Sequence, residues 1–221
     1  MHWLDHVELA RPAVSVELLR VAMPRCPDIE EWAEELSEAL AWGGIHDPAE
    51  VAMFLAQVGH ESADLTRLSE NLNYSVAGLL KTFGRHRITK AQAQRYGRSQ
   101  GRPADQQAIA NIIYGGEWGR RNLGNTAPGD GWRHRGMGPI QLTGKANQRA
   151  CQEATGLPIL DNPERLATLP RYGAMASAWY WITRVTPGVS IERVTREVNG
   201  GRHGLADRRN RYERIMRHIH A

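Results

Sequence analysis

The segment DPAEVAMFLAQVGHES, residues 47–62, decides the fold of the first half of the chain. Asp47 is suited to cap a helix, Pro48 fits the first helical position, and Glu50 can complete a capping box. Apolar side chains then recur at helical spacing, at Val51, Phe54, Leu55 and Val58. The segment therefore predicts a helix from Pro48 to about Ser62 with one buried face.

One glutamate lies at the end of this helix and a second lies shortly after it. Glu61 lies three residues beyond Val58 on the apolar face, and apolar neighbours disfavour the charged form of a carboxyl group, which suits a general acid. Glu70 comes nine residues later in a polar segment, and a solvated carboxylate stays ionised, which suits a general base. Single glutamates are mostly solvated surface residues, but two carboxylates in unlike surroundings are what glycosidic bond cleavage requires.

A glycine-rich segment, GDGWRHRGMGPIQLTG at residues 129–144, follows downstream. Dense glycine between short apolar runs predicts tight turns and a small β hairpin. Glycines also let the backbone approach a ligand closely. The segment contains no P-loop or dinucleotide-binding pattern.

Four segments of the chain together resemble glycoside hydrolase family 19, in the form found in phage and prophage endolysins. They stand in the family's order at 59–62, 69–75, 129–144 and 198–208. The resemblance implies a lysozyme-like fold and no cofactor or metal. It also implies hydrolysis of β-1,4 bonds between N-acetylated amino sugars, and hence lysis of bacterial cells through their peptidoglycan.

The family's mechanism inverts the configuration of the sugar. By resemblance, Glu61 donates a proton to the glycosidic oxygen, Glu70 activates a water, and the Thr143 hydroxyl helps to hold that water. Inversion needs room for this water, so the two carboxyl groups of such an enzyme are roughly 6.5–9.5 Å apart.

Further residues are expected to contact sugar or to tune the carboxylates. Trp132 is the aromatic residue best placed for the cleft, His60 is expected to orient Glu61 or bind sugar, and Arg208 is expected to keep Glu70 ionised. The remaining expected sugar contacts are Tyr74, Gln141, Asn147 and Asn199.

The chain departs from the family pattern at two positions. Met137 stands where the family has Arg, so any ion pair of that Arg is absent or supplied by Arg133 or Arg135. Gln148 stands where the family commonly has Tyr, which removes a stacking surface for sugar. These departures concern the contacts with substrate and leave the reaction class unchanged.

The rest of the chain is predominantly helical in pattern. We expect one catalytic domain over residues 1–221, mainly α, with no separate wall-binding module. Residues 84–128 are rich in Gln, Arg and Gly, and are interpreted as a small helical lobe beside the cleft, although a surface excursion of the main domain fits equally well. Further helices are predicted at 29–40, 75–83, 103–114, 144–155, 163–183, 191–198 and 204–218.

Composition limits the cellular context. Cys26 and Cys151 form neither a disulfide framework nor a metal pattern, so both are expected to be free, buried thiols. Residues 1–22 contain acidic side chains that interrupt any signal-peptide core. We therefore expect a monomer that is made in the host cytoplasm and reaches the wall through a phage-made membrane lesion.

The net charge of +4 is concentrated at the C-terminus. Residues 190–221 hold eight Arg and four acidic residues, which accounts for the whole excess. Such a segment would draw the enzyme to the anionic bacterial envelope.

Three other functions fit parts of the sequence. Chitin is an alternative substrate, because the same acid–base pair could cleave it. A basic helix suggests a nucleic-acid-binding protein, but a solvated helix face is the simpler interpretation and we expect no nucleic acid partner. Nine His suggest a metal hydrolase, although the chain has no H-E-x-x-H motif.

Overall fold

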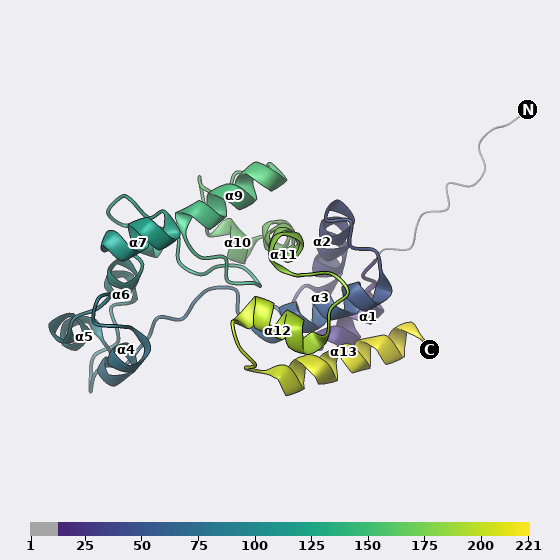
Figure 1. Ribbon diagram of the computed structural model, residues 1–221, viewed down its shortest axis with the longest axis horizontal. Coiled ribbons are helices and arrows are strands. Elements are labelled where there is room, and N and C mark those ends of the chain that lie inside the picture. The colour runs from purple at the N-terminus through teal and green to yellow at the C-terminus, as the bar shows by residue number, and fades with distance from the viewer. Residues whose placement is uncertain (1–12) are drawn as a thin grey trace, which may run out of the picture.

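The computed structural model describes residues 13–221, which form thirteen helices in two lobes (Figure 1). The helices of the larger lobe are α1 (Val16–Ala22), α2 (Ile29–Trp42), α3 (Pro48–Glu61), α11 (Pro170–Arg184), α12 (Ile191–Asn199) and α13 (Leu205–Ile219). Those of the smaller lobe are α4 (Val76–Thr82), α5 (Lys90–Tyr96), α6 (Gln106–Ile113) and α7 (Gly116–Leu123). Three helices near the junction are α8 (Asp130–Arg133), α9 (Lys145–Thr155) and α10 (Arg165–Thr168).

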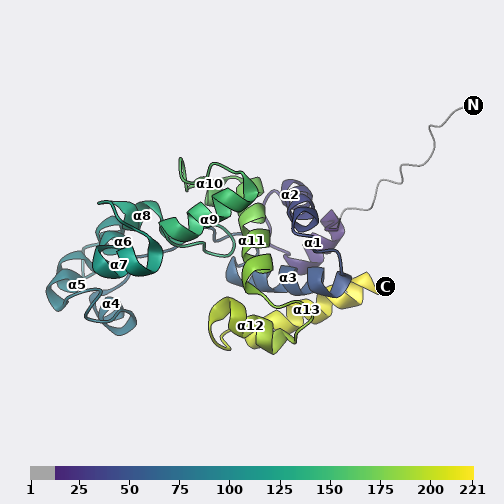
Figure 2. The same ribbon diagram turned by 45° about the horizontal axis from the view of Figure 1, so that its top comes forward.

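Helix α3 lies at the centre of the larger lobe. It starts as its sequence predicts, because the Glu50 amide donates to Asp47 Oδ1 at 2.9 Å and Pro48 occupies its first turn. Its residues from Val51 to Gly59 are all buried. Helix α13 packs along α3, and α2 packs against α11 (Figure 2). This packing holds the helix that carries Glu61 rigidly from several sides.

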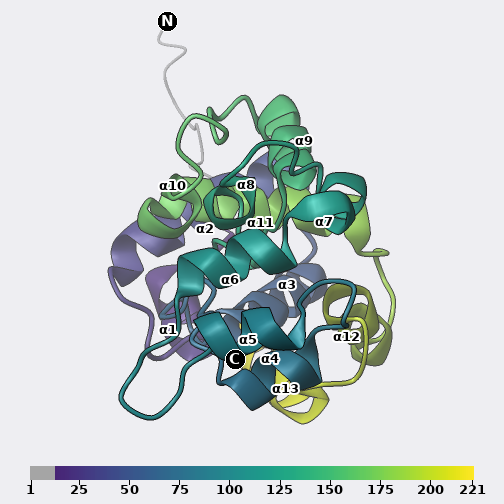
Figure 3. The ribbon, with the colours of Figure 1, turned by 90° about the vertical axis from the view of Figure 1, so that its left-hand side faces the viewer.

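The smaller lobe, whose helices α4, α5 and α6 face the viewer in Figure 3, has an apolar cluster of its own. The cluster runs from Leu72 through α4, α5 and α6 to Ile113. It therefore begins before residue 84, where the composition of the sequence changes. The assignment of residues 84–128 as a lobe within a single domain stays a prediction.

Helix α5 was not predicted, although the sequence carries its signal. Thr89 and Gln92 form a complete capping box, in which the Gln92 amide donates to Thr89 Oγ1 at 3.2 Å and the Thr89 amide donates to Gln92 Oε1 at 2.9 Å. A Thr followed three residues later by Gln is the pattern of such a start.

The predicted helix over 163–183 is wrong in one respect. It is divided at Leu169 into α10 and α11, because Pro170 disfavours the helical conformation for the residue before it. Helix α7, which lies within residues 84–128, was not predicted either.

The glycine-rich segment forms isolated antiparallel bridges in place of longer strands. Met137 pairs with Leu142 on one side and with Ser69 on the other. The predicted hairpin is thus reduced to its smallest form, while the prediction of a mainly helical chain is confirmed. Within residues 13–221, no helix combines the length and apolar character needed to cross a membrane.

The two cysteines differ in their surroundings. Both are free thiols, as predicted, but Cys151 is fully buried whereas Cys26 is only partly covered. Burial raises the pKa of both thiols to about 12. Neither thiol is therefore a nucleophile at neutral pH.

Candidate active site

Glu61 and Glu70 line one open cavity of about 700 Å³. Glu61 is the last residue of α3, and Glu70 lies on the extended segment that leads from α3 to the smaller lobe. Gln141 and Ala167 also line the cavity. The two glutamates that the sequence singled out are thus brought to the same space.

The backbone at Glu70 is paired with the glycine-rich segment. The Glu70 amide donates to the Gly136 carbonyl at 3.0 Å, and the Gly138 amide donates to the Leu68 carbonyl at 2.7 Å. These two hydrogen bonds fix the position of residues 68–70. The glycine-rich segment therefore supports Glu70.

Both carboxylate oxygens of Glu70 accept hydrogen bonds. Tyr114 donates its hydroxyl to Oε1 at 2.6 Å, and the Gly136 amide donates to Oε2 at 3.3 Å. Donors of this kind favour the ionised form of a carboxyl group. The environment of Glu70 therefore suits a base.

Tyr114 is a functional residue that sequence reasoning missed. It caps the C-terminus of α6 and reaches Glu70 across 44 residues of sequence. Burial, the charge of Glu70 and the hydrogen bond to it together raise the pKa of Tyr114. Its hydroxyl thus keeps its proton and remains a donor to Glu70.

Replacing Tyr114 with Phe tests this support. Glu70 loses a hydrogen-bond donor that holds its carboxylate, so kcat should fall by up to about 100-fold, because a hydrogen bond to a charged group is worth about 1.5–3 kcal/mol. Tyr96→Phe is the matched control, since Tyr96 packs against the same apolar cluster. An unchanged kcat in Tyr114→Phe would show that the hydroxyl does not support Glu70.

Gly136 is the point where the remaining polar groups meet. A Cβ atom at this position would lie 3.0 Å from Gln141 Oε1, 3.1 Å from Thr143 Oγ1 and 3.3 Å from Glu70 Oε2. A larger residue at this position would displace these three groups, so the position requires glycine. Thr143 and Gln141 therefore lie beside the Glu70 carboxylate, where the sequence predicted them.

Asn147 stabilises this arrangement from α9. It donates its side-chain amide to the Thr143 carbonyl at 2.8 Å, and its own oxygen accepts from Arg184 at 3.3 Å. Asn147 thus holds the backbone of Thr143.

Arg208 corrects the sequence-based assignment. It was expected to act on Glu70, but its guanidinium forms an ion pair with Glu61 and also donates to Gln57 Oε1. Arg208 is fully buried, and Glu61 is its only carboxylate partner within residues 13–221. The sequence suggested apolar neighbours for Glu61, but the charged Arg208 is also its partner.

The chain makes a left-handed turn directly after Glu61. Ala63, Asp64 and Leu65 have φ values of 51°, 64° and 63°. A left-handed residue other than glycine costs roughly 1–2 kcal/mol. Three in succession are retained only where the surrounding structure holds them.

Besides Asn147, four expected sugar contacts do not line the cavity between the glutamates. Tyr74 packs edge-on against Phe83 in the smaller lobe, with ring centroids 5.4 Å apart. The ring of Trp132 is covered on one face by the Arg135 guanidinium at 3.9 Å. Asn199 is exposed at the end of α12.

The fourth of these, His60, contacts α13. Its Nδ1 lies 2.7 Å from Asp207 Oδ2, and its ring packs against Gly204 so closely that a Cβ there would lie 2.1 Å from Nε2. His60 thus joins two helices and does not face the cavity.

The two residues that depart from the family pattern are buried inside the protein. Met137 is fully buried, and Gln148 is buried against His134, whose Nδ1 lies 2.6 Å from Gln148 Oε1. Arg135 pairs with Glu164, and Arg133 donates to the Leu160 carbonyl. Neither arginine replaces a cation beside the two glutamates.

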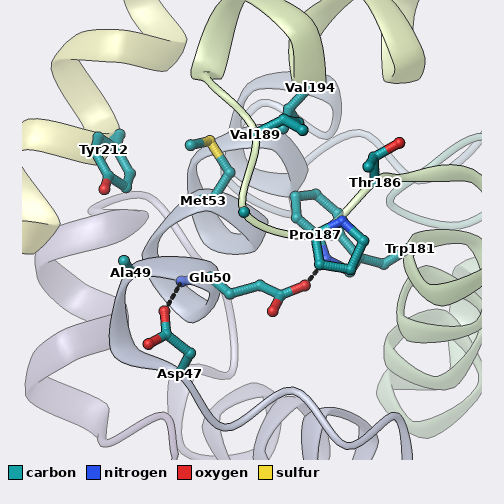
Figure 4. Close-up of a pocket in the computed structure, with 11 residues that line it drawn as sticks. Asp47, Ala49, Glu50, Met53, Trp181, Thr186, Pro187, Val189, Val194 and Tyr212 are labelled. Carbon is teal, nitrogen blue, oxygen red and sulfur yellow. Dashed lines mark hydrogen bonds between the residues drawn. The ribbon is translucent and has the colours of Figure 1, made fainter.

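A second cavity, of about 380 Å³, lies between α3, α11 and α13 (Figure 4). Its two carboxylates both have structural roles. Asp47 caps α3, and Glu50 Oε1 accepts from Trp181 Nε1 at 3.0 Å. In the described part of the chain, no group of His, Cys, Asp and Glu could hold a metal ion. The cavity with Glu61 and Glu70 is therefore the candidate active site.

A helical, two-lobed fold with two glutamates on one open cavity is the arrangement of a glycoside hydrolase. The sequence is 36% identical over 184 residues to a glycosyl hydrolase family 19 domain-containing protein of Haemophilus influenzae. The aligned residues are 83% of this chain and 86% of that protein. The family model described as chitinase class I matches residues 124–200. The chain belongs to glycoside hydrolase family 19 and is a chitinase-like enzyme.

Plant proteins match over a shorter stretch. A basic endochitinase of Brassica napus is 35% identical over 95 residues, which are 40% of this chain and 35% of that protein. This match is limited to part of each chain.

Solved structures confirm the lysozyme-like fold expected of the family. A bacterial family 19 chitinase superposes with a TM-score of 0.59 at 21% identity, covering 93% of this chain and 94% of the other. A class IV chitinase of Zea mays gives 0.55 at 15% identity, covering 95% and 94%. The predicted family is confirmed, and the phage form of it stays a prediction.

Proposed function

We propose that this enzyme hydrolyses the β-1,4 bonds of bacterial peptidoglycan with inversion and thereby lyses bacterial cells, as an endolysin does. Glu61 is the general acid and Glu70 is the general base. The observation that carries the proposal is the pair of glutamates on one cavity, of which Glu70 alone is held by neutral donors. An acid–base pair needs two carboxylates that open on one cavity.

The reaction follows from these positions. Glu70 takes a proton from a water, whose oxygen attacks the anomeric carbon as the glycosidic bond breaks. Glu61 gives its proton to the departing sugar oxygen. Thr143 and Gln141 lie where they can hold the attacking water beside Glu70.

Arg67 supports peptidoglycan over chitin as the substrate. It is exposed, lines the cavity beside both glutamates, and forms no ion pair with any of residues 13–221. Peptidoglycan carries carboxylates on its lactyl groups and peptides, whereas chitin is neutral. An unpaired guanidinium at the cavity gives the anionic polymer a contact that chitin lacks.

The charge of Arg67 can be removed to test this preference. Arg67→Gln is expected to lower kcat/KM on peptide-bearing glycan by up to about fivefold, the upper range for an exposed ion pair, and to leave cleavage of chitin oligomers unchanged. Arg85→Gln is the control, because Arg85 is an exposed arginine of the smaller lobe outside this cavity. Equal effects of Arg67→Gln on both substrates, or faster cleavage of chitin than of peptidoglycan by the unaltered enzyme, would favour the chitinase alternative.

Attraction to the anionic envelope is also proposed, but it rests on fewer arginines than the sequence suggested. Arg208 and Arg211 are buried, and Arg209 pairs with Glu192. The exposed arginines of residues 190–221 that form no ion pair in the described chain are Arg196, Arg202 and Arg217. The basic helix that was considered for nucleic acid therefore does not present a continuous row of free arginines. A monomer that reaches the wall through a membrane lesion is the setting we propose.

A further inference from the structure

We propose that Asp64 and Arg211 are positioning residues, whose ion pair holds the left-handed turn after Glu61 and so sets the position of the proton donor. This inference rests on the proposed role of Glu61 as the acid. It concerns residues outside the cavity, since Asp64 is fully buried.

Helix α13 contacts the end of α3 through a repeated pattern of charged side chains. Asp207 meets His60 at 2.7 Å, and Arg208 pairs with Glu61. Arg211 Nη1 meets Asp64 Oδ1 at 2.5 Å, while its Nε meets Asp207 Oδ2 at 2.7 Å. We call the first three of these contacts, which join α13 to residues 60–64, the α13 clamp. The α13 clamp contacts the last turn of α3 at His60 and Glu61, and the turn that follows at Asp64.

Asp64 is the most deeply buried carboxylate of the α13 clamp. Its other oxygen accepts from Arg25 Nε at 2.9 Å, so arginines from two separate segments meet at one carboxylate. A buried charge is retained only where its partners compensate for the lost water. Burial alone would lower the pKa of Arg211, but its hydrogen bonds to Asp207 and Asp64 outweigh this and raise the pKa.

The Asp64 backbone is as constrained as its side chain. Its amide donates to the Gly59 carbonyl at 2.8 Å, and the next amide, of Leu65, donates to Ser62 Oγ at 2.9 Å. The turn over residues 63–65 is nevertheless left-handed throughout, without a glycine. The Asp64–Arg211 pair thus holds a conformation that the local sequence does not favour.

This turn connects two parts of the site that are held by different elements. Glu61 is held on α3 by Arg208, whereas residues 68–70 are held by Gly136 and Gly138. The only covalent connection between acid and base is the segment 62–69. A change in the turn therefore alters the position of Glu61 relative to Glu70, and small displacements of catalytic groups can cost about 100-fold in rate.

Asp64→Asn in the full chain tests the α13 clamp, because it removes the charge at nearly constant shape. The readout is the dependence of kcat on the leaving group, measured with aryl glycosides of β-1,4-linked N-acetylated amino sugars. A poor leaving group needs the acid, whereas an activated one such as 2,4-dinitrophenolate does not. We expect kcat to fall about 10- to 100-fold for the phenyl glycoside, to stay within about threefold for the activated one, and KM to stay unchanged.

Arg214→Gln is the matched control. Arg214 also belongs to α13, but it donates to the carbonyls of Val21 and Ala22 and touches none of residues 60–64. Its loss should lower thermal stability without making kcat depend more strongly on the leaving group. Arg211→Lys keeps the charge but loses the guanidinium geometry. It should show the same leaving-group signature as Asp64→Asn, and it serves in its place should that variant not fold.

The outcomes separate this inference from the proposed function. Equal loss on both substrates in Asp64→Asn or Arg211→Lys, or no loss, overturns the positioning role. Glu61→Gln is measured in parallel, and if its loss is also independent of the leaving group, the acid assignment itself fails. A leaving-group dependence in Glu61→Gln but in neither clamp variant contradicts the positioning role alone.

Discussion

Replacing Glu61 with Gln is expected to lower kcat on the natural glycan by about 10³-fold, within the range of general acid catalysis. The amide keeps the shape of the side chain but has no proton of suitable acidity for the glycosidic oxygen. KM should change little, because the cavity retains its other lining residues. Initial rates of reducing-end formation at saturating substrate measure the effect.

The same substitution should also lower stability. Glu61 is the carboxylate partner of the buried Arg208, and its loss leaves a charge compensated only by amide and carbonyl oxygens. A cost of about 1–3 kcal/mol is expected, which a thermal melt would detect as a lower Tm. Assays well below that Tm keep the two effects apart.

Glu50→Gln is the control for Glu61→Gln. Glu50 lies on the same helix, and its Oε1 accepts from Trp181, which an amide oxygen can also do. Its rate should match that of the unaltered enzyme. A Glu61→Gln enzyme that keeps more than about a tenth of the original kcat would contradict its role as the acid.

Replacing Glu70 with Gln is expected to lower kcat by a similar factor of about 10³, because an amide cannot accept the proton of the attacking water. Unlike Glu61, Glu70 is held by a hydroxyl and a backbone amide, and it forms no ion pair within the described residues. The amide oxygen of Gln can still accept from Tyr114. The Tm should therefore stay close to that of the unaltered enzyme.

The contrast between the two variants is itself informative. Both should be inactive, but only Glu61→Gln should be clearly less stable. Glu164→Gln is the control for Glu70→Gln, since Glu164 loses its pair with Arg135 away from the cavity. An active Glu70→Gln enzyme would remove Glu70 from the mechanism and leave its contacts with Tyr114 and Gly136 as a structural support.

Much of the site could be predicted because its signals are local. Asp47 and Pro48 define the start of α3, and the apolar periodicity carries the helix to Glu61. The glycine pattern indicated close approach of the backbone, which the structure shows at Gly136. The prediction of α13 was close as well, because its apolar and charged residues alternate at helical spacing.

Other features could not be predicted because they depend on tertiary contacts. The partner of Arg208 is Glu61, 147 residues away, and local sequence does not distinguish this carboxylate from Glu70. The hydroxyl of Tyr114 reaches Glu70 across 44 residues of sequence. Of Ala63, Asp64 and Leu65, only Asp64 is of a type enriched in the left-handed region, so the sequence does not indicate three such residues in succession.

The configuration of the new sugar ends tests most directly whether Glu61 and Glu70 cleave peptidoglycan with inversion. Peptidoglycan would be digested in an NMR tube, and the anomeric proton signals recorded before the products equilibrate. Inversion of a β-1,4 bond predicts that the α anomer of the reducing end appears first. Initial release of the β anomer, or clearing of the wall without new reducing ends, would contradict the mechanism proposed for this enzyme.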